Sequence, residues 1–274
     1  AIEVTRLPAP GRADAPPALD PAALRRAAEL LNGAARPVLL AGAGVIAAGA
    51  SALVREIAER ASLPVAATLL GLGVLPDGHP LALGMIGMHG APYVNHLLDE
   101  CDLLIALGVR FDDRATGKAS EFCPRAQIVH VDIDASELGK MKTAVLGLRA
   151  DVGQALAALA PRVAPAERPA WRARLAALRA AWPLAMPGAD DPLEPYGIVR
   201  RAAQAAGPDA IVTTDVGQHQ MWVAQAYPFG RPRQLLSSGG LGTMGFGLPA
   251  AIGAALAAPE RPVLCFTGDG SLLM

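Results

Sequence analysis

The sequence lacks an excess of charge of either sign. Lys and Arg number 24 and Asp and Glu number 25, so the formal net charge of the 274 residues is −1. Surfaces that bind nucleic acid or an anionic membrane need a concentration of positive charge. We therefore expect neither nucleic acid nor a membrane as a partner, and a small-molecule ligand fits the composition better.

Long apolar segments and a leader peptide are missing as well. No apolar run reaches the length of about 18 residues that a membrane span needs, and no charged segment followed by an apolar one opens the chain. These absences predict a soluble protein. The chain starts with Ala1 and ends at Met274, shortly after a Gly-Asp-Gly segment. We expect it to be cut short at both ends, because natural domains rarely stop at such a place.

Cysteine is scarce and scattered. Cys101, Cys123 and Cys265 are odd in number and form no C-x-x-C motif or Cys/His cluster. This pattern argues against a disulfide framework and against a structural metal site. We expect reduced, mostly buried thiols and a cytoplasmic location.

What the sequence has in abundance is apolar residues, at 52% against 18% charged, which is enough for two domains. Residues 1–19 read as an extended linker. Asp20 and Pro21 then open a helix, with Asp20 as N-cap and Gly33 just past its end. The expected strands that follow are 37–41, 65–68, 102–107, 127–133 and 144–148, and the expected helices are 48–62, 90–100 and 151–160. Such alternation predicts an α/β fold with a doubly wound, mostly parallel sheet over residues 20–160.

A proline-rich stretch at 161–195 surrounds one helix at about 170–182 and is typical of an interdomain connector. A second α/β series occupies 196–274 and is unfinished. Its expected helices are 196–206, 218–226 and 244–257, and its expected strands are 210–214, 234–237 and 262–267.

Two glycine-rich segments of the first domain are candidates for ligand binding. GAGVIA at 42–47 lies between a strand and a helix, as in the relaxed dinucleotide fingerprint. The next strand ends at Thr68 rather than at an acidic residue, which argues against ordinary NAD binding. A turn that serves only close packing is the alternative. GMIGMHG at 84–90 reads as a loop before a helix, in which His89 has no metal-ligand partner at helical spacing and is by itself more typical of a structural loop histidine.

Charged residues follow two further strands of the first domain. GVRFDDR at 108–114 comes after one strand and VHVDID at 129–134 ends another, while Asp151 begins a helix. Open α/β sheets bind ligands at this end of their strands, and carboxylates there can accept hydrogen bonds from sugar hydroxyls. A solvated loop with internal Arg–Asp pairs, and a simple N-cap role for Asp151, are the alternatives.

In the second domain, polar and glycine-rich segments again follow the strands. DVGQHQMW at 215–222 follows the first, and SSGGLGTMGFG at 237–247 offers backbone N–H groups and a helix N-terminus to an anion. Close packing at a helix entrance is the alternative. GDGS at 268–271 ends an apolar strand, where one carboxylate between glycines could hold Mg²⁺.

Taken together, these segments resemble the thiamine-diphosphate enzymes, and among them the anabolic acetolactate synthases. The resemblance runs from about residue 20 to 274. Its specific parts are GMHG at 87–90, RFDDR at 110–114, VDIDASELGK at 131–140, VGQHQMW at 216–222, SSGGLGTMGFGLPAAIGA at 237–254 and GDGS at 268–271. It implies that residues 1–19 come from a missing N-terminal domain, that 20–160 form a Rossmann-like FAD-binding domain, and that 196–274 begin a thiamine-diphosphate-binding domain.

The resemblance also implies site residues. Those near a structural FAD would be Gly42, Ala43, Gly44, Thr68, Leu69, Gly87, Met88, His89, Gly108, Arg110, Asp112, Asp132, Ile133 and Asp151. Those near thiamine diphosphate would be Gln218, His219, Gly242, Thr243, Met244, Gly270 and Ser271. Asp269 would bind Mg²⁺, Met244 would support the bent cofactor, and Met88, Asp113 and Arg114 would lie at the substrate entrance. The family's catalytic Glu and a second metal ligand, an Asn, are not in this chain, so we expect no catalytic residue here and no activity from the chain alone.

For the whole enzyme, the resemblance implies decarboxylation of pyruvate and its condensation with a second 2-oxo acid such as 2-oxobutyrate, giving 2-acetolactate or 2-aceto-2-hydroxybutyrate for branched-chain amino acid biosynthesis. It also implies a homodimer or tetramer, with a possible small regulatory subunit. Glyoxylate carboligase, a 2-oxo acid decarboxylase and a non-catalytic nucleotide-binding module are the alternatives.

Overall fold

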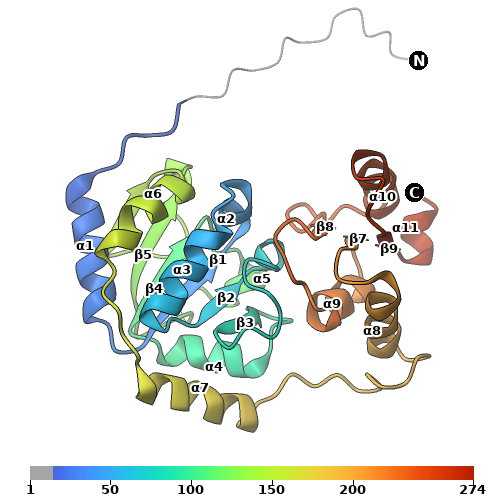
Figure 1. Cartoon of the computed structure of the whole chain (residues 1–274), viewed down its shortest axis with the longest axis horizontal. Helices are drawn as coiled ribbons and strands as arrows, with labels where there is room; N and C mark the ends of the chain where they lie inside the picture. Colours follow the sequence, from blue (N-terminus) through green and yellow to red (C-terminus); the bar gives the residue numbers. More distant parts are fainter. Residues whose placement is uncertain (1–14) are drawn as a thin grey trace, which may run out of the picture.

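A computed structural model describes residues 15–274, and it contains two parallel sheets flanked by helices (Figure 1). The expected α/β class is confirmed. The first sheet has the order β3-β2-β1-β4-β5-β6, which is the doubly wound order with its reversal between β1 and β4. Its strands are β1 (Pro37–Ala41), β2 (Val65–Ala67), β3 (Ala82–Met85), β4 (Leu103–Leu107), β5 (Gln127–Asp132) and β6 (Leu146–Arg149).

Helices cover both faces of the first sheet. They are α1 (Pro21–Gly33), α2 (Ala43–Ala47), α3 (Ser51–Ala61), α4 (Pro92–Glu100), α5 (Asp113–Thr116), α6 (Val152–Leu159) and α7 (Pro169–Ala181), with short 3₁₀ turns η1 (Leu69–Gly71), η2 (Ala135–Glu137) and η3 (Ala160–Arg162). We call this part, α1 to α7, the central unit. In β1, Leu39 packs toward α1, α3 and α6, whereas Leu40 packs toward α4 and α7. Successive side chains of a strand point to opposite faces, so a strand buried on both sides is apolar throughout.

The first helix begins as the sequence predicts. Asp20 accepts a hydrogen bond from the backbone N–H of Ala22 at 2.8 Å, and Pro21 is the first helical residue. The helix runs through Gly33 instead of ending before it. Residues 15–20 have no regular structure, and the rest of the expected linker, residues 1–14, lies outside the described part of the chain.

Three expectations for the central unit are wrong in detail. Gly84 and Met85 belong to strand β3, which pairs with β2, and not to a loop. The helix expected at 48–62 begins only at Ser51, as α3, because the chain turns at Gly49, whose φ is +64°, after the separate short helix α2. The connector helix, α7, is part of the core of the central unit, since Trp171, Leu175 and Leu178 are buried against α4 and the sheet.

The second sheet has the order β8-β7-β9. Its strands are β7 (Ile211–Thr214), β8 (Leu235–Ser237) and β9 (Val263–Phe266), and its helices are α8 (Pro195–Ala206), α9 (Gln218–Ala226), α10 (Gly247–Ala257) and α11 (Asp269–Leu272). We call this part, α8 to α11, the C-terminal unit. The expected helix at 244–257 starts at Gly247. The apolar strand before Gly-Asp-Gly, β9, is only partly buried.

Two expectations drawn from absences can be compared with the described residues. Within 15–274 none of the helices has the length and apolar character to cross a membrane. The three cysteines are unpaired; Cys101 and Cys123 are buried, as expected, and Cys265 is partly buried.

Candidate functional site

The residues expected near FAD lie along one edge of the first sheet. All strand pairings are parallel, so the carboxyl ends of the six strands share this edge. Gly42 follows β1, Thr68 follows β2, Gly87 follows β3 and Gly108 follows β4. Asp132 is the last residue of β5, and Asp151 follows β6. The fold therefore brings residues from 42 to 151 to the edge where open α/β sheets bind ligands.

The glycines at the reversal between β1 and β4 are in direct backbone contact. Gly42 N–H donates to the carbonyl of Leu107 at 3.0 Å, and Gly44 N–H donates to that of Gly108 at 3.3 Å. A Cβ atom added to Gly44 would lie 2.6 Å from the Cα of Gly108. Close packing alone thus requires glycine at Gly44, as the alternative for this motif predicted.

The loop after β3 and the turn after β4 meet. Met88 N–H donates to the carbonyl of Arg114 at 3.0 Å, and the Arg114 guanidinium lies 3.8 Å from the Met88 sulfur. Asn95 holds the loop from the other side by hydrogen bonds to both backbone groups of Gly87. Met88 is 58% exposed. Two of the three residues expected at a substrate entrance are therefore in contact, and the third, Asp113, begins α5 beside them.

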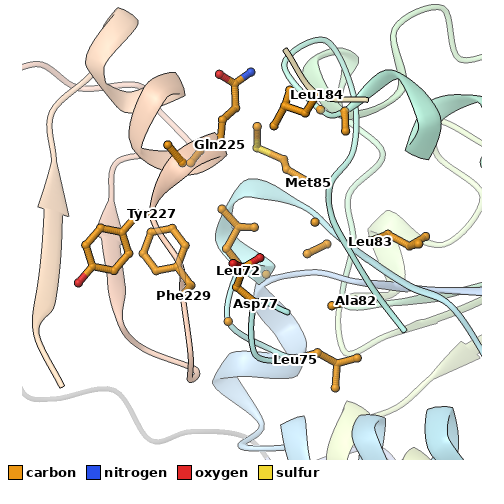
Figure 2. A pocket seen from close by; sticks show the side chains of 18 of the residues that line it. Leu72, Leu75, Asp77, Ala82, Leu83, Met85, Leu184, Gln225, Tyr227 and Phe229 are labelled. Atoms are coloured by element: carbon orange, nitrogen blue, oxygen red, sulfur yellow. The ribbon is translucent and has the colours of Figure 1, made fainter. Parts of the chain in front are cut away.

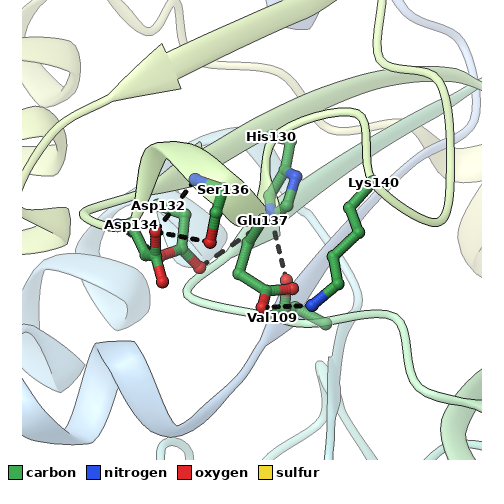
Figure 3. A network of polar contacts seen from close by, with 7 residues as sticks. All are labelled: Val109, His130, Asp132, Asp134, Ser136, Glu137 and Lys140. Carbon is green, nitrogen blue, oxygen red and sulfur yellow. Dashed lines mark hydrogen bonds and ion pairs between the residues drawn. The ribbon is translucent and has the colours of Figure 1, made fainter.

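A polar network that joins the buried His130 and Asp132 to exposed residues of the following turn lies at the same edge (Figure 3). Nε2 of His130 lies 2.8 Å from the carbonyl of Val109, and the His130 ring packs edge-on against Phe111, whose φ is +55°. Burial lowers the pKa of His130, so the ring is neutral and donates from Nε2. Through its hydrogen bond to Val109, His130 holds the turn that carries Arg110. The sequence gave no sign of this role, because the histidine lies within a predicted strand.

The carboxylates of this edge differ in their freedom to bind a ligand. Asp132 accepts a hydrogen bond from the N–H of Asp134, and burial raises the pKa of Asp132 above its ordinary value. Asp151 and Asp112 cap α6 and α5 by accepting from Gln154 and Ala115, as the alternative reading predicted for Asp151. No Arg–Asp ion pair occurs within 110–114 among the described contacts.

A second edge forms where β7 and β9 end. Gln218 and His219 begin α9, which is separated from the end of β7 by three residues. The His219 ring lies 3.1 Å from the Cβ position of Gly217 and 3.5 Å from that of Gly268, which places it between the two strand ends. Burial lowers the pKa of His219, and its Nε2 is buried without a hydrogen-bond partner among the described atoms.

The glycine-rich segment and the Gly-Asp-Gly-Ser segment meet at this edge. The turn at 238–243 closes by hydrogen bonds from Gly242 and Thr243 to Ser238. The Met244 methyl lies 3.5 Å from the Cβ position of Gly270. Ser271 is buried, and its hydroxyl has no partner among the described atoms. The predicted thiamine-diphosphate residues from three segments are thus brought together.

Asp269 stands alone as a candidate metal ligand. It is exposed in the first turn of α11. The described residues contain no cluster of three or more His, Cys, Asp or Glu side chains suited to a metal ion. A single carboxylate can still hold Mg²⁺ when phosphate oxygens and water complete the coordination.

One expectation for the glycine-rich segment is wrong. The N–H groups at the start of α10 do not face an open anion site, because Asp215 already occupies that position. Its Oδ1 accepts from Phe246 N–H at 2.9 Å, and the N–H groups of Gly245 and Gly247 also point to this carboxylate.

The two edges lie next to each other. A Cβ on Gly239 would contact Leu70 at 3.0 Å, and the Arg110 guanidinium is 3.9 Å from the Cβ position of Gly240. Gln225 donates to the backbone carbonyl of His89 at 2.8 Å. The segments expected at FAD and at thiamine diphosphate therefore meet at the contact between the two units.

A cavity of about 270 Å³ also lies between the units (Figure 2). Leu72 and Met85 line it from the central unit, and Gln225, Tyr227 and Phe229 line it from the C-terminal unit. Of the predicted site residues, only His89 reaches it. The cavity is thus separate from the thiamine-diphosphate segments.

Comparison with known proteins agrees with this arrangement. Residues 24–159 match the family "Thiamine pyrophosphate enzyme, central domain", and residues 215–274 match "Thiamine pyrophosphate enzyme, C-terminal TPP binding domain". The acetolactate synthase isozyme 1 large subunit of Escherichia coli K12 is 56% identical over 273 residues, which cover 100% of this chain and 48% of that protein.

Two further relatives are more distant. An acetolactate synthase large subunit of Parasynechococcus marenigrum is 47% identical over 94% of this chain and 42% of its own length. A probable acetolactate synthase large subunit of Methanocaldococcus jannaschii is 41% identical over 100% of this chain and 49% of its own length. The chain spans about half the length of the curated relatives it matches. Because the central unit matches the family's central domain and the C-terminal unit matches its C-terminal domain, the chain belongs to the thiamine pyrophosphate enzyme family.

Proposed function

We propose that the protein containing this chain is the catalytic large subunit of an acetolactate synthase, which decarboxylates pyruvate and joins the resulting two-carbon unit to a second 2-oxo acid. The observation that carries the proposal is the meeting of 242–244 with 268–271 beside His219, in a chain that resembles acetolactate synthase large subunits from end to end. The products are 2-acetolactate from a second pyruvate and 2-aceto-2-hydroxybutyrate from 2-oxobutyrate.

The residues at the C-terminal edge fit thiamine diphosphate. The unpaired Ser271 hydroxyl and the hydroxyl of the exposed Thr243 supply donors for a diphosphate, and Asp269 supplies the oxygen ligand for its Mg²⁺. Met244 supplies an apolar support, and Gln218 and His219 line the side of the site. When bound, the cofactor supplies the electron sink that decarboxylation of a 2-oxo acid requires. The chain's own residues bind and orient it and exclude water.

The edge of the first sheet fits FAD in a structural role. Gly42, Gly44 and Gly108 pack backbone to backbone at this edge, where the ends of parallel strands can line a diphosphate or an extended ribityl chain. Asp132 keeps one carboxylate oxygen for a hydroxyl group, since the other accepts from Asp134. Arg110 is directed toward the C-terminal unit, and Met88, Asp113 and Arg114 form the substrate entrance.

The partners of the whole protein belong to the same proposal. Its substrates are pyruvate and 2-oxobutyrate, and it works in the cytoplasm as a homodimer or tetramer, with a small regulatory subunit as a possible partner. That the three cysteines form no disulfide supports the cytoplasmic location.

The test is an assay of the protein encoded by the gene that contains this sequence. Acetolactate formed from pyruvate should require both thiamine diphosphate and Mg²⁺. Asp269→Asn should raise the Mg²⁺ concentration needed for half-maximal activity at least tenfold, whereas Asp209→Asn, an exposed carboxylate of the same unit, should not. Product from glyoxylate instead of pyruvate, or activity without thiamine diphosphate, would contradict the proposal.

A further inference from the structure

Asp215 is a buried carboxylate that the proposed function leaves without a role. It follows β7 directly, and only 1% of its surface is exposed. A buried carboxylate is costly unless hydrogen bonds compensate for the lost water. The hydrogen-bond donors around Asp215 therefore indicate which segments this carboxylate holds in place.

Donors from two separate segments converge on Asp215. Oδ1 accepts from the N–H of Phe246 at 2.9 Å, and Oδ2 accepts from the Thr267 hydroxyl at 2.8 Å. The N–H groups of Gly245 and Gly247 add to these bonds. Burial raises the pKa of Asp215, but the hydrogen bonds outweigh it and keep that pKa below its ordinary value. The carboxylate is thus ionised and fully engaged.

The start of α10 depends on this carboxylate. No side chain within the helix caps it, so Asp215, 31 residues earlier, supplies the negative charge that a helix N-terminus favours. This contact also requires glycine at position 247, because a Cβ there would lie 2.6 Å from Oδ2 of Asp215.

The two segments that Asp215 holds lie directly beside the proposed cofactor residues. Phe246 is two positions after Met244, and Thr267 is two positions before Asp269. One carboxylate therefore ties the glycine turn and the Gly-Asp-Gly-Ser segment to the end of β7. It also occupies the α10 N-terminus, so a diphosphate has to be held by other groups, such as the hydroxyls of Thr243 and Ser271.

We propose that Asp215 is a positioning residue: without touching the cofactor, it sets the separation between 242–244 and 268–271 and so determines the affinity for the magnesium–diphosphate group. The inference rests on the proposed function. It assigns to Asp215 a role different from that of the cofactor-contacting residues Gln218 and His219.

The first measurement follows the pinned backbone itself, without any cofactor. Hydrogen exchange read by mass spectrometry should show at least tenfold faster exchange over residues 244–248 in Asp215→Asn and in Gly247→Ala, which displaces the carboxylate without removing it. Asp209→Asn should leave this segment unchanged. Unchanged exchange in both test variants would overturn the inference.

The second measurement is cofactor binding by the full protein, followed by quenching of tryptophan fluorescence. Asp215→Asn and Gly247→Ala should raise the Kd for thiamine diphosphate with Mg²⁺ at least tenfold, while FAD content stays at the wild-type level. Should Asp215→Asn fold poorly, Thr267→Val, which removes only the hydroxyl donor, should raise the Kd to a smaller extent.

The two failures are distinguishable. A wild-type protein that binds no thiamine diphosphate would contradict the proposed function and the positioning role together. A wild-type protein that binds it, with variants of equal affinity, would contradict the positioning role alone.

Discussion

At the scale of single residues, Gly44 has no room for a side chain, because its backbone packs on that of Gly108. We expect Gly44→Ala to lower the free energy of unfolding by about 2 kcal/mol, as overpacking against backbone atoms does. Urea denaturation measures the change. Gly33→Ala is the matched control, since nothing lies within 4 Å of its Cβ position and alanine in a helix is favoured over glycine. It should be neutral or stabilising; equal losses in both variants would contradict the packing argument.

His130 makes stability depend on pH. Its pKa is lowered in the folded protein, whereas an unfolded histidine has a pKa of about 6.5. The unfolded chain then binds the proton more readily, so the stability contributed by neutral His130 is present above about pH 6.5 and is lost as the pH falls below that value.

The variant that isolates this effect is His130→Gln, which keeps an N–H donor but does not titrate. Between pH 7 and pH 5, the unfolding free energy of the wild type should fall more steeply than that of His130→Gln. Denaturation curves at several pH values measure both slopes, and parallel slopes would show that the histidine is not the titrating group.

At the scale of elements, Arg168 anchors α7 to the central unit. Its guanidinium donates to the backbone carbonyls of Leu31, Ala34 and Ala61, at the ends of α1 and α3. Hydrogen bonds from a charged group contribute up to about 1.5–3 kcal/mol each. Because Arg168 is only partly buried, water can replace part of the three lost bonds, and Arg168→Ala should lower the unfolding free energy by about 2–4 kcal/mol. Arg172→Ala, which removes one exposed ion pair of the same helix, should change it by less than about 1 kcal/mol. Denaturant titrations compare the two.

The elements also show how far the sequence predicts this fold. Strong patterns such as the fully buried strand β4 and the Asp20 helix start were predicted almost to the residue. Strand β3 was not, because four residues that include Gly84 carry no alternation and resemble a loop. The role of Asp215 was equally hidden, since a cap supplied from 31 residues away leaves no local signal. The edge residues 42, 108 and 132 were grouped by the family resemblance, and the parallel strands do place them at one edge of the sheet.

At the scale of the whole molecule, the proposed sites depend on how firmly the two units are joined. Leu72 belongs to the central unit but packs against the apolar core of the C-terminal unit, beside the cavity of Figure 2. Leu53 is partly buried as well, yet packs only within the central unit. The pair allows the contact between the units to be tested separately from the stability of either.

We expect Leu72→Ala to cost about 1–3 kcal/mol and to loosen the C-terminal unit in particular. Hydrogen exchange of β7 and β8 should quicken, while that of β1 and β4 stays at the wild-type rate. Leu53→Ala should have the opposite effect, with faster exchange in β1 and β4 and the wild-type rate in β7 and β8. In units that unfold separately, the loss of one apolar contact speeds hydrogen exchange in only one sheet. If both variants speed exchange equally in both sheets, the two units unfold as one, and the cofactor segments at their contact form a single cooperative structure.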